Sequence, residues 1–273
     1  MRRAALALVP MASVVVGCAA SGADPGDAET ATATSAVVVI ERSTDTAQGT
    51  RAEASARFVR VSASTSPTTA LRGVGAGIDL PAAGACSPLA SLPEASPSEP
   101  PPVAELLDVG TVALEANGLA TRLLPRQLPD VTDVVSGVVY ARAADATLLP
   151  PSAEYVVHVG GGAGFASTEL SASAPADPSD VRLQGEETAD AGGLVTGGAN
   201  VVLEWNEDAS GDQVYVDVAP SAVRCLMESG GHGIVPSAFL DDAGTLVLHR
   251  LHRESLRAGE IRFDFARTVA YAR

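Results

Sequence analysis

The sequence predicts an all-β protein with two small β-sandwich domains, immunoglobulin-like in type, that follow a disordered N-terminal stalk. Apolar and polar residues alternate with a period of two in short runs such as TVALEA and EYVVHVG, which indicates half-buried strands. Gly, Pro, Asp and Asn separate these runs at the short spacing that is typical of sandwiches and barrels. No window of eleven or more residues carries the apolar stripe of an amphipathic helix.

The first residues have the features of an export signal. Arg2 and Arg3 precede an apolar run over residues 4–16, which has the length of a signal-peptide core and is too short to cross a bilayer. The sequence VVGC at residues 15–18 resembles the lipobox of bacterial lipoproteins, which implies cleavage after residue 17 and acylation of Cys18. The alternative is an ordinary secretory signal with an incidental cysteine.

Composition excludes several functional classes. Removing residues 1–17 takes away two arginines and no acids, so the formal net charge falls from −15 to −17. Such an excess of acid disfavours binding to nucleic acids and electrostatic adhesion to anionic lipids. All 18 basic residues other than histidine are arginine. Without lysine there is no Walker A loop, no Schiff-base enzyme and no Ser-x-x-Lys acyltransferase.

The N-terminal third is expected to be a stalk, a lead-in segment and a tether. Residues 18–56 are dominated by Ala, Ser, Thr, Gly and Asp, too few apolar groups to offset the entropy of ordering, so we predict a flexible stalk with at most one edge strand at residues 37–40. Residues 57–91 begin with RFVRVSA and form the lead-in segment. Residues 92–102, LPEASPSEPPP, form an extended proline-rich tether.

Two sandwich domains are expected after the tether, at residues 103–178 and 179–273. The sequence APADPSD at residues 174–180 marks the boundary between them, and each part has a size that suits one small sandwich. One larger sandwich is the alternative. The expected strands contain TVALEA, VVSGVVYARA, EYVVHVG, NVVLEW, QVYVDV, AVRCLM, TLVLHRL and EIRFDFAR.

The acidic stretch NEDASGDQVYVD, residues 206–217, is the strongest metal candidate. Asn206, Asp208, Ser210 and Asp212 have the spacing of the first ligands of an EF-hand calcium loop. An EF-hand needs a helix on each side, however, and here alternating runs flank the loop. We therefore predict the turn of a β-hairpin. A looser surface calcium site at Asp208 and Asp212 is the alternative.

The histidines form no recognisable catalytic or zinc-binding set. His249 and His252 are three residues apart on a predicted strand, so their side chains point to opposite faces. His158 and His232 have no nearby set of Cys, Asp or Glu that would complete a zinc site. We assign no catalytic residue and no cofactor.

Segments distributed beyond residue 56 resemble a family of predicted lipoproteins in myxobacteria. The resemblance is carried by RFVRVSA, DLPAAGACSPL, ELLDVGTV, PDVTDVVSGVVY, VYVDVA, VRCLMESGGHGIVPSAFL and EIRFDFARTVA. It implies a fold and no known activity. Residues 201–269 also resemble an immunoglobulin-like or fibronectin III-like sandwich, with Trp205 in the core and Cys225 on a middle strand, but without a second cysteine in that domain.

These observations lead to two functional hypotheses. The first is a non-enzymatic, membrane-anchored lipoprotein of the cell envelope that binds or scaffolds another envelope protein or a glycan. The second is an envelope hydrolase of unrecognised type with residues drawn from loops. Ala19, rather than an acidic residue, follows Cys18, which by the enteric sorting rule favours the outer membrane. A cluster of His with Asp or Glu in a concave pocket would favour the hydrolase.

Cys86 and Cys225 are expected to form a disulfide. Once Cys18 is acylated they are the only thiols left, and an exported protein is in an oxidising compartment where such pairs close. The bridge would join the lead-in segment to the C-terminal domain. In the alternative, Cys225 is a buried small apolar residue and Cys86 a thiol exposed to solvent.

Overall fold

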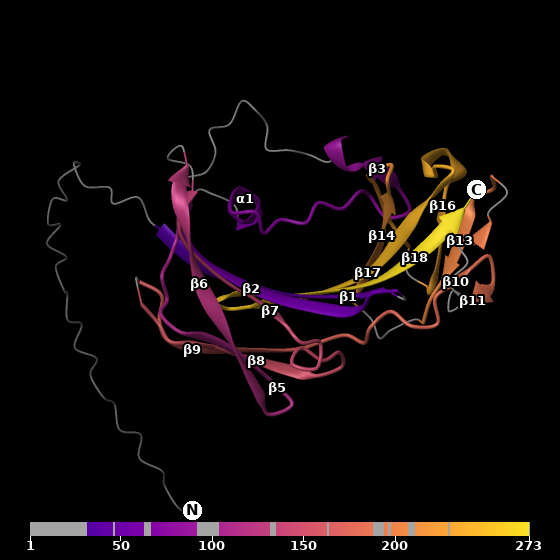
Figure 1. The fold of residues 1–273 in the computed structure, drawn as a ribbon. Helices are drawn as coiled ribbons and strands as arrows, with labels where there is room; N and C mark the ends of the chain where they lie inside the picture. The colour runs from indigo at the N-terminus through magenta and orange to yellow at the C-terminus, as the bar shows by residue number, and fades with distance from the viewer. Residues whose placement is uncertain are drawn as a thin grey trace, which may run out of the picture. The chain divides into compact units, whose positions relative to one another are not determined.

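A computed structural model describes residues 32–45, 47–62, 67–91, 104–131, 135–162, 164–187, 194–195, 198–206, 211–228 and 230–272. In this part of the chain the only α-helix is α1 (Pro67–Gly73), and the short 3-10 turns η1 (Leu89–Ser91) and η2 (Ser237–Phe239) accompany it. Everything else that is regular is β-strand (Figure 1). The prediction of an all-β fold is confirmed.

Most strands belong to one large sheet. Its spatial order is β3 (Cys86–Pro88), β15 (Val223–Leu226), β14 (Gln213–Ala219), β17 (Ala243–Leu256), β18 (Gly259–Ala272), β1 (Thr32–Asp45), β2 (Gly49–Ser62), β4 (Ala104–Leu106), β7 (Val135–Ala144), β6 (Leu119–Val131), β5 (Val112–Ala116), β8 (Glu154–Val159) and β9 (Thr168–Ser173), with β12 (Leu194–Val195) beside β18. A second sheet has the order β11 (Glu186–Glu187), β10 (Arg182–Leu183), β13 (Val201–Glu204) and β16 (His232–Val235).

The large sheet turns back on itself through β6 and encloses a first core. The first part of β6, as far as Leu123, pairs with β5, and the part from Leu124 onward pairs with β7. Strands β5, β8 and β9 therefore lie against the central strands (Figure 1). The core between the two layers includes Ile40 of β1, Phe58 of β2 and Phe263 of β18 on one side and Tyr155 of β8 on the other.

The second sheet covers a second core. Leu203 and Trp205 from the end of β13 pack with Val216 of β14 and Leu248 of β17, and all four are buried. Trp205 thus lies in the core, as the alternation of its segment predicted. The two cores lie on the same face of the large sheet because inward side chains of β17 and β18 contribute to both.

The expectation of a flexible stalk is wrong for residues 32–45 and 49–56. Strand β1 is central rather than peripheral: it pairs in parallel with β18 and antiparallel with β2. The run AVVVI, residues 36–40, is buried on both faces. Such a continuous apolar run is typical of a strand in a sheet that is covered on both sides. Strand β2 continues through residue 57, so no segment boundary lies there. The predicted signal peptide at residues 1–17, residues 18–31 and the predicted tether at residues 92–102 lie outside the described residues.

The predicted division between residues 178 and 179 coincides with a change of core, while the large sheet continues across it. Ala174 packs in the first core and Val181 in the second. Strand β18, however, contributes Phe263 to the first core and Tyr271 to the second. From Thr32 onward the chain forms one compact unit, because the same long strands serve as one wall of both sandwiches.

The opposite face of the large sheet is partly covered by the segment between α1 and β3, residues 74–85, which we call the strap. Ile78 and Leu80 of the strap pack against Tyr215 and Leu251. The guanidinium of Arg262 donates to the carbonyl of Ala76 at 2.7 Å. The strap therefore covers a face that the two cores leave free.

The strap leads into strand β3, which pairs with the edge strand β15 and is bonded to it covalently. A disulfide joins Cys86 of β3 to Cys225 of β15, 139 residues further along the chain. Cys225 is buried in the second core, and Cys86 packs against that core. The predicted pairing is confirmed.

Candidate functional site

A hollow of about 600 Å³ opens on the face of the large sheet that carries the strap. We call it the trough; residues 41–43, 50–53, 143–146, 247, 249, 264 and 266 line it. These residues come from β17, β18, β1, β2 and β7 and from the turn after β7. Each of the five strands pairs with the next, because β2 also pairs directly with β7 beside the trough, through residues 52–57. The trough therefore crosses the strands and has a floor of paired backbone.

Side-chain size explains why this part of the face is hollow. Further along the same strands, Val37, Val39 and Val59 pack under Val74 and Ala76 of the strap. In the trough the side chains on this face include the small residues Ser43, Ala143 and Ala266. These small side chains leave a concave surface, the usual shape of a ligand site.

Three carboxylates form a row across the trough. Glu41 of β1 is the direct register partner of Glu53 on β2 and of Asp264 on β18. Partial removal from water, followed by repulsion from Asp264 and Glu53, raises the pKa of Glu41, although Arg57 and His249 oppose the shift. Like charges directly opposite each other destabilise a sheet, so this row favours an added proton or positively charged group.

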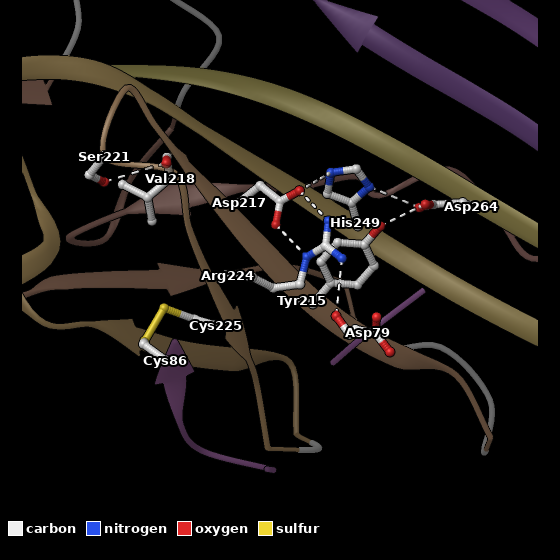
Figure 2. Close-up of polar contacts among 10 residues, drawn as sticks. All are labelled: Asp79, Cys86, Tyr215, Asp217, Val218, Ser221, Arg224, Cys225, His249 and Asp264. Carbon is white, nitrogen blue, oxygen red and sulfur yellow. Dashed lines mark hydrogen bonds and ion pairs between the residues drawn. A yellow bond between two sulfur atoms is a disulfide. The ribbon is translucent and has the colours of Figure 1, made fainter. Parts of the chain in front are cut away.

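A polar network supports one wall of the trough (Figure 2). The imidazole of His249 lies between two carboxylates: its Nδ1 is 2.9 Å from Oδ1 of Asp264, and its Nε2 is 3.8 Å from Oδ2 of Asp217. The Tyr215 hydroxyl donates to Oδ2 of Asp264 at 2.6 Å. Arg224 holds Asp217 through two hydrogen bonds of 2.7 Å each.

Hydrogen bonds and charges within this network offset the energetic cost of burying its polar groups. Burial alone would raise the pKa of Asp264, but hydrogen bonds from His249 and Tyr215 and the charges of His249 and Arg224 lower it. Burial, and then the charge of Asp264, raises the pKa of Tyr215, so its hydroxyl remains a donor. Both ring nitrogens of His249 face carboxylates. The network is therefore well suited to fix the shape of the trough wall.

A second hollow, of about 560 Å³, lies elsewhere and is lined by Glu154, Ser171, Ser173, Asp212, His252 and Glu254 among others. The Nδ1 atom of His252 is 2.7 Å from Oδ1 of Asp212, and its Nε2 atom is 3.9 Å from Glu254. The side chains of His249 and His252 thus point to opposite faces of β17, as their spacing predicted.

The prediction of a β-hairpin at residues 206–217 is wrong. Strand β13 before the loop belongs to the second sheet, and β14 after it belongs to the large sheet. The connection therefore crosses between the two layers of the second sandwich. Asp217, the last residue of this acidic stretch, accepts two hydrogen bonds from Arg224. Alternating runs reveal which residues point inward but not which sheet each strand joins.

Of the two residues of the alternative calcium site, Asp208 and Asp212, the structure describes only Asp212. Asp208 lies outside the described residues. Asp212 pairs with His252, and its Oδ2 is 3.9 Å from Nε of Arg250. Within the described ranges no group of three or more His, Cys, Asp or Glu is placed to hold a metal ion. Cys18, the expected lipid attachment site, also lies outside them.

Sequence reasoning missed the trough and its network. The signal was present as alternate polar residues on predicted strands: Tyr215 and Asp217 in QVYVDV, His249 in TLVLHRL and Asp264 in EIRFDFAR. Their partners could not be deduced because strand order was unknown.

No protein-family model matches the chain, and no curated protein matches it. In the part of the chain that the structure describes, no helix has the length and hydropathy needed to span a bilayer.

Proposed function

We propose that this protein is an exported lipoprotein of the cell envelope, anchored through Cys18 in the outer membrane, that binds a ligand in the trough. The signal-like N-terminus, the lipobox-like VVGC and the resemblance to predicted myxobacterial lipoproteins support the anchor. The disulfide between Cys86 and Cys225 is in keeping with an oxidising compartment.

The observation that carries the binding role is the carboxylate row of Glu53, Glu41 and Asp264 in a hollow of about 600 Å³. Carboxylates accept hydrogen bonds and attract positive charge. The ligand that complements this surface is therefore rich in donors, as are the hydroxyls of a glycan or the basic side chains of another envelope protein. The paired backbone of five neighbouring strands makes the site rigid before binding, which reduces the entropic cost of association.

Affinity capture with matched variants tests the proposal. The acylated full-length protein is used to capture envelope proteins and glycans, alongside a Glu41→Gln, Glu53→Gln double variant of nearly the same shape. An exposed pair far from the trough, Glu186→Gln with Glu187→Gln, is the charge-matched control. We expect the trough variant to lose a component that the wild type and the control both retain. Identical captured components in all three samples would reject the trough as the binding site.

A second candidate, an envelope hydrolase, is favoured by one observation: the His249–Asp264 pair borders the trough. A carboxylate that orients an imidazole beside a pocket is a common acid–base arrangement. A His249→Asn variant separates the two functions. A hydrolase would lose turnover of a captured glycan or peptide while retaining its binding, whereas a binding protein would show no turnover in either form.

A further inference from the structure

Strand β6 carries an exposed row of alternating basic and apolar residues. Arg122, Leu124, Arg126 and Leu128 are all exposed, with Leu124 at 53% and Leu128 at 38%. Because side chains of a strand alternate between its faces, residues two apart lie on the same side. A third guanidinium lies close by, since Arg142 of β7 donates to the backbone carbonyl of Arg122 at 3.3 Å. We call Arg122, Leu124, Arg126 and Leu128 the β6 row.

The β6 row approaches the end of the sheet at which the folded chain begins. Strand β1 starts at Thr32, and Figure 1 shows this start near the tip of β6. A series of paired residues connects the two places: Thr32 with Ser62, Val61 with Ala104, Ala104 with Val135, and Gly137 with Leu128. Four strand spacings separate β1 from β6 in this order, or roughly 20 Å.

The length of chain before β1 keeps this end of the sheet near a lipid anchor. Thr32 lies 14 positions after Cys18 in the sequence, and a chain of that length spans at most about 50 Å when fully extended. If Cys18 carries the lipid, as in the proposed function on which this step rests, the β6 row is always within reach of the bilayer surface.

We propose that the β6 row docks on the phosphate headgroups of the anchoring membrane and orients the folded unit. The guanidinium groups pair with phosphates, and the exposed leucines enter the interface between headgroups and acyl chains. The net charge of −17 that remains once residues 1–17 are removed does not prevent this contact, because salt screens charges beyond roughly 8–10 Å. Asp130 and Asp133 follow the row in the sequence and offset part of its positive charge. The leucines are therefore as important for docking as the arginines.

The β6 row and the trough lie on the same face of the large sheet, because Arg126 of the row is the register partner of Val139 on β7, and Val139 packs under the strap. Glu41 lies nine residues along β1 from Thr32, and nine residues of strand span about 30 Å. The trough occupies the end of the β1–β2 pair nearer to its turn, whereas Thr32 lies at the other end. Within the β6 row, Leu124 pairs with Ala141 and Leu128 with Gly137, so the Leu128 end of the row is the end further from trough residues 143–146.

Tryptophan quenching tests the docking. Leu124→Trp places a reporter in the β6 row, and Gln48→Trp places one in the exposed turn after β1. The native Trp205, only 8% exposed, is a constant background in both. Full-length acylated protein is incorporated into vesicles of phosphatidylcholine and phosphatidylglycerol that contain brominated phosphatidylcholine. We expect the reporter at position 124 to lose fluorescence about twofold and to shift to the blue, and the reporter at position 48 to change little, because an interfacial segment is buried only ~5–10 Å deep.

Matched variants identify the groups that make the contact. In the Leu124→Trp protein, Arg122→Gln with Arg126→Gln, and separately Leu128→Ser, should each restore fluorescence. The control pair, Arg182→Gln with Arg253→Gln, removes two exposed arginines outside the β6 row and the trough and should have no effect. Equal quenching at positions 48 and 124, or none at 124 in protein that remains on the vesicles, would overturn the docking and leave the lipid anchor intact.

The anchor and the docking can also fail separately. Mass spectrometry of Cys18 reports acylation in the same samples. If Cys18 is not acylated, the proposed anchor fails. The proposal on β6 is then tested by whether the free chain binds vesicles that contain phosphatidylglycerol more tightly than vesicles of phosphatidylcholine alone. A blue shift at position 124 that needs an added acidic protein instead of lipid would assign the β6 row to a protein partner and reject the membrane.

Discussion

The imidazole of His249 stacks on the phenol ring of Tyr215, its register partner on the adjacent strand, with ring centroids 4.3 Å apart and an angle of 9° between the planes. Both side chains also bond to the same carboxylate, Asp264. The stack and the shared acceptor fix the position of each ring, so the wall of the trough depends on a group from β18, one strand beyond His249.

Asp264→Asn should destabilise the fold by about 1–3 kcal/mol, because a buried charged acceptor of two hydrogen bonds is lost. Its side chain is 8% exposed, so solvent screening is small. The pKa of Asp264 is lowered in the folded protein; this contribution is therefore present above the unfolded pKa and is lost as pH falls through the folded pKa. Urea unfolding at several pH values should show a smaller loss of stability below pH ~4 in the variant. A variant as stable as the wild type would contradict a structural role for the network.

Glu41→Gln should stabilise the protein at neutral pH, by about 0.2–1 kcal/mol if the cross-strand repulsion is typical. The folded pKa of Glu41 is raised, so the ionised wild type is penalised above that pKa, and the gain disappears below the unfolded pKa near ~4.3 where both forms are neutral. Thermal unfolding at neutral and acidic pH measures the difference. The effect of Glu53→Gln should not add to it, because the two residues share one repulsion. A destabilised Glu41→Gln protein at neutral pH would indicate a hidden favourable partner.

Replacing Cys86 by Ser should lower the free energy of unfolding by about 4–5 kcal/mol in the chain-entropy model, because the bridge closes a loop of 139 residues. Cys225→Ser adds a buried hydroxyl to the second core and should be somewhat worse. Reducing and non-reducing denaturant titrations of the wild type provide a comparison without mutation. Non-reducing mass spectrometry should find the two cysteine peptides linked, and two alkylatable thiols in the purified protein would refute the bridge.

Cys18→Ser should abolish palmitate labelling and release the protein from membranes, because the thiol is the attachment point that the lipobox-like sequence implies. Density fractionation of the wild type should place it with the outer membrane. Cys86→Ser is the matched cysteine variant and should remain labelled. Persistent membrane attachment of the Cys18→Ser protein would reject the lipoprotein proposal.

Several features followed directly from the sequence. Alternation with a period of two predicted strands in both halves, and it placed Trp205 inward and His249 and His252 on opposite faces. The pairing of Cys86 with Cys225 followed from the small number of thiols. These properties are local or nearly so, since side-chain direction and the number of partners are fixed before strand order is known.

Only the tertiary structure decided strand order, and with it the trough. The run at residues 36–40 could have been an edge strand, but burial of both its faces required neighbours from residues 49–62 and 259–272. The loop at residues 206–217 resembles a hairpin in sequence, yet its two strands pair in different sheets. Glu41, Glu53 and Asp264 meet for the same reason: non-local pairing brings together residues up to 223 positions apart. A periodic pattern specifies the face on which a side chain lies, whereas backbone hydrogen bonds are alike for every strand and leave the choice of neighbour to packing of the whole chain.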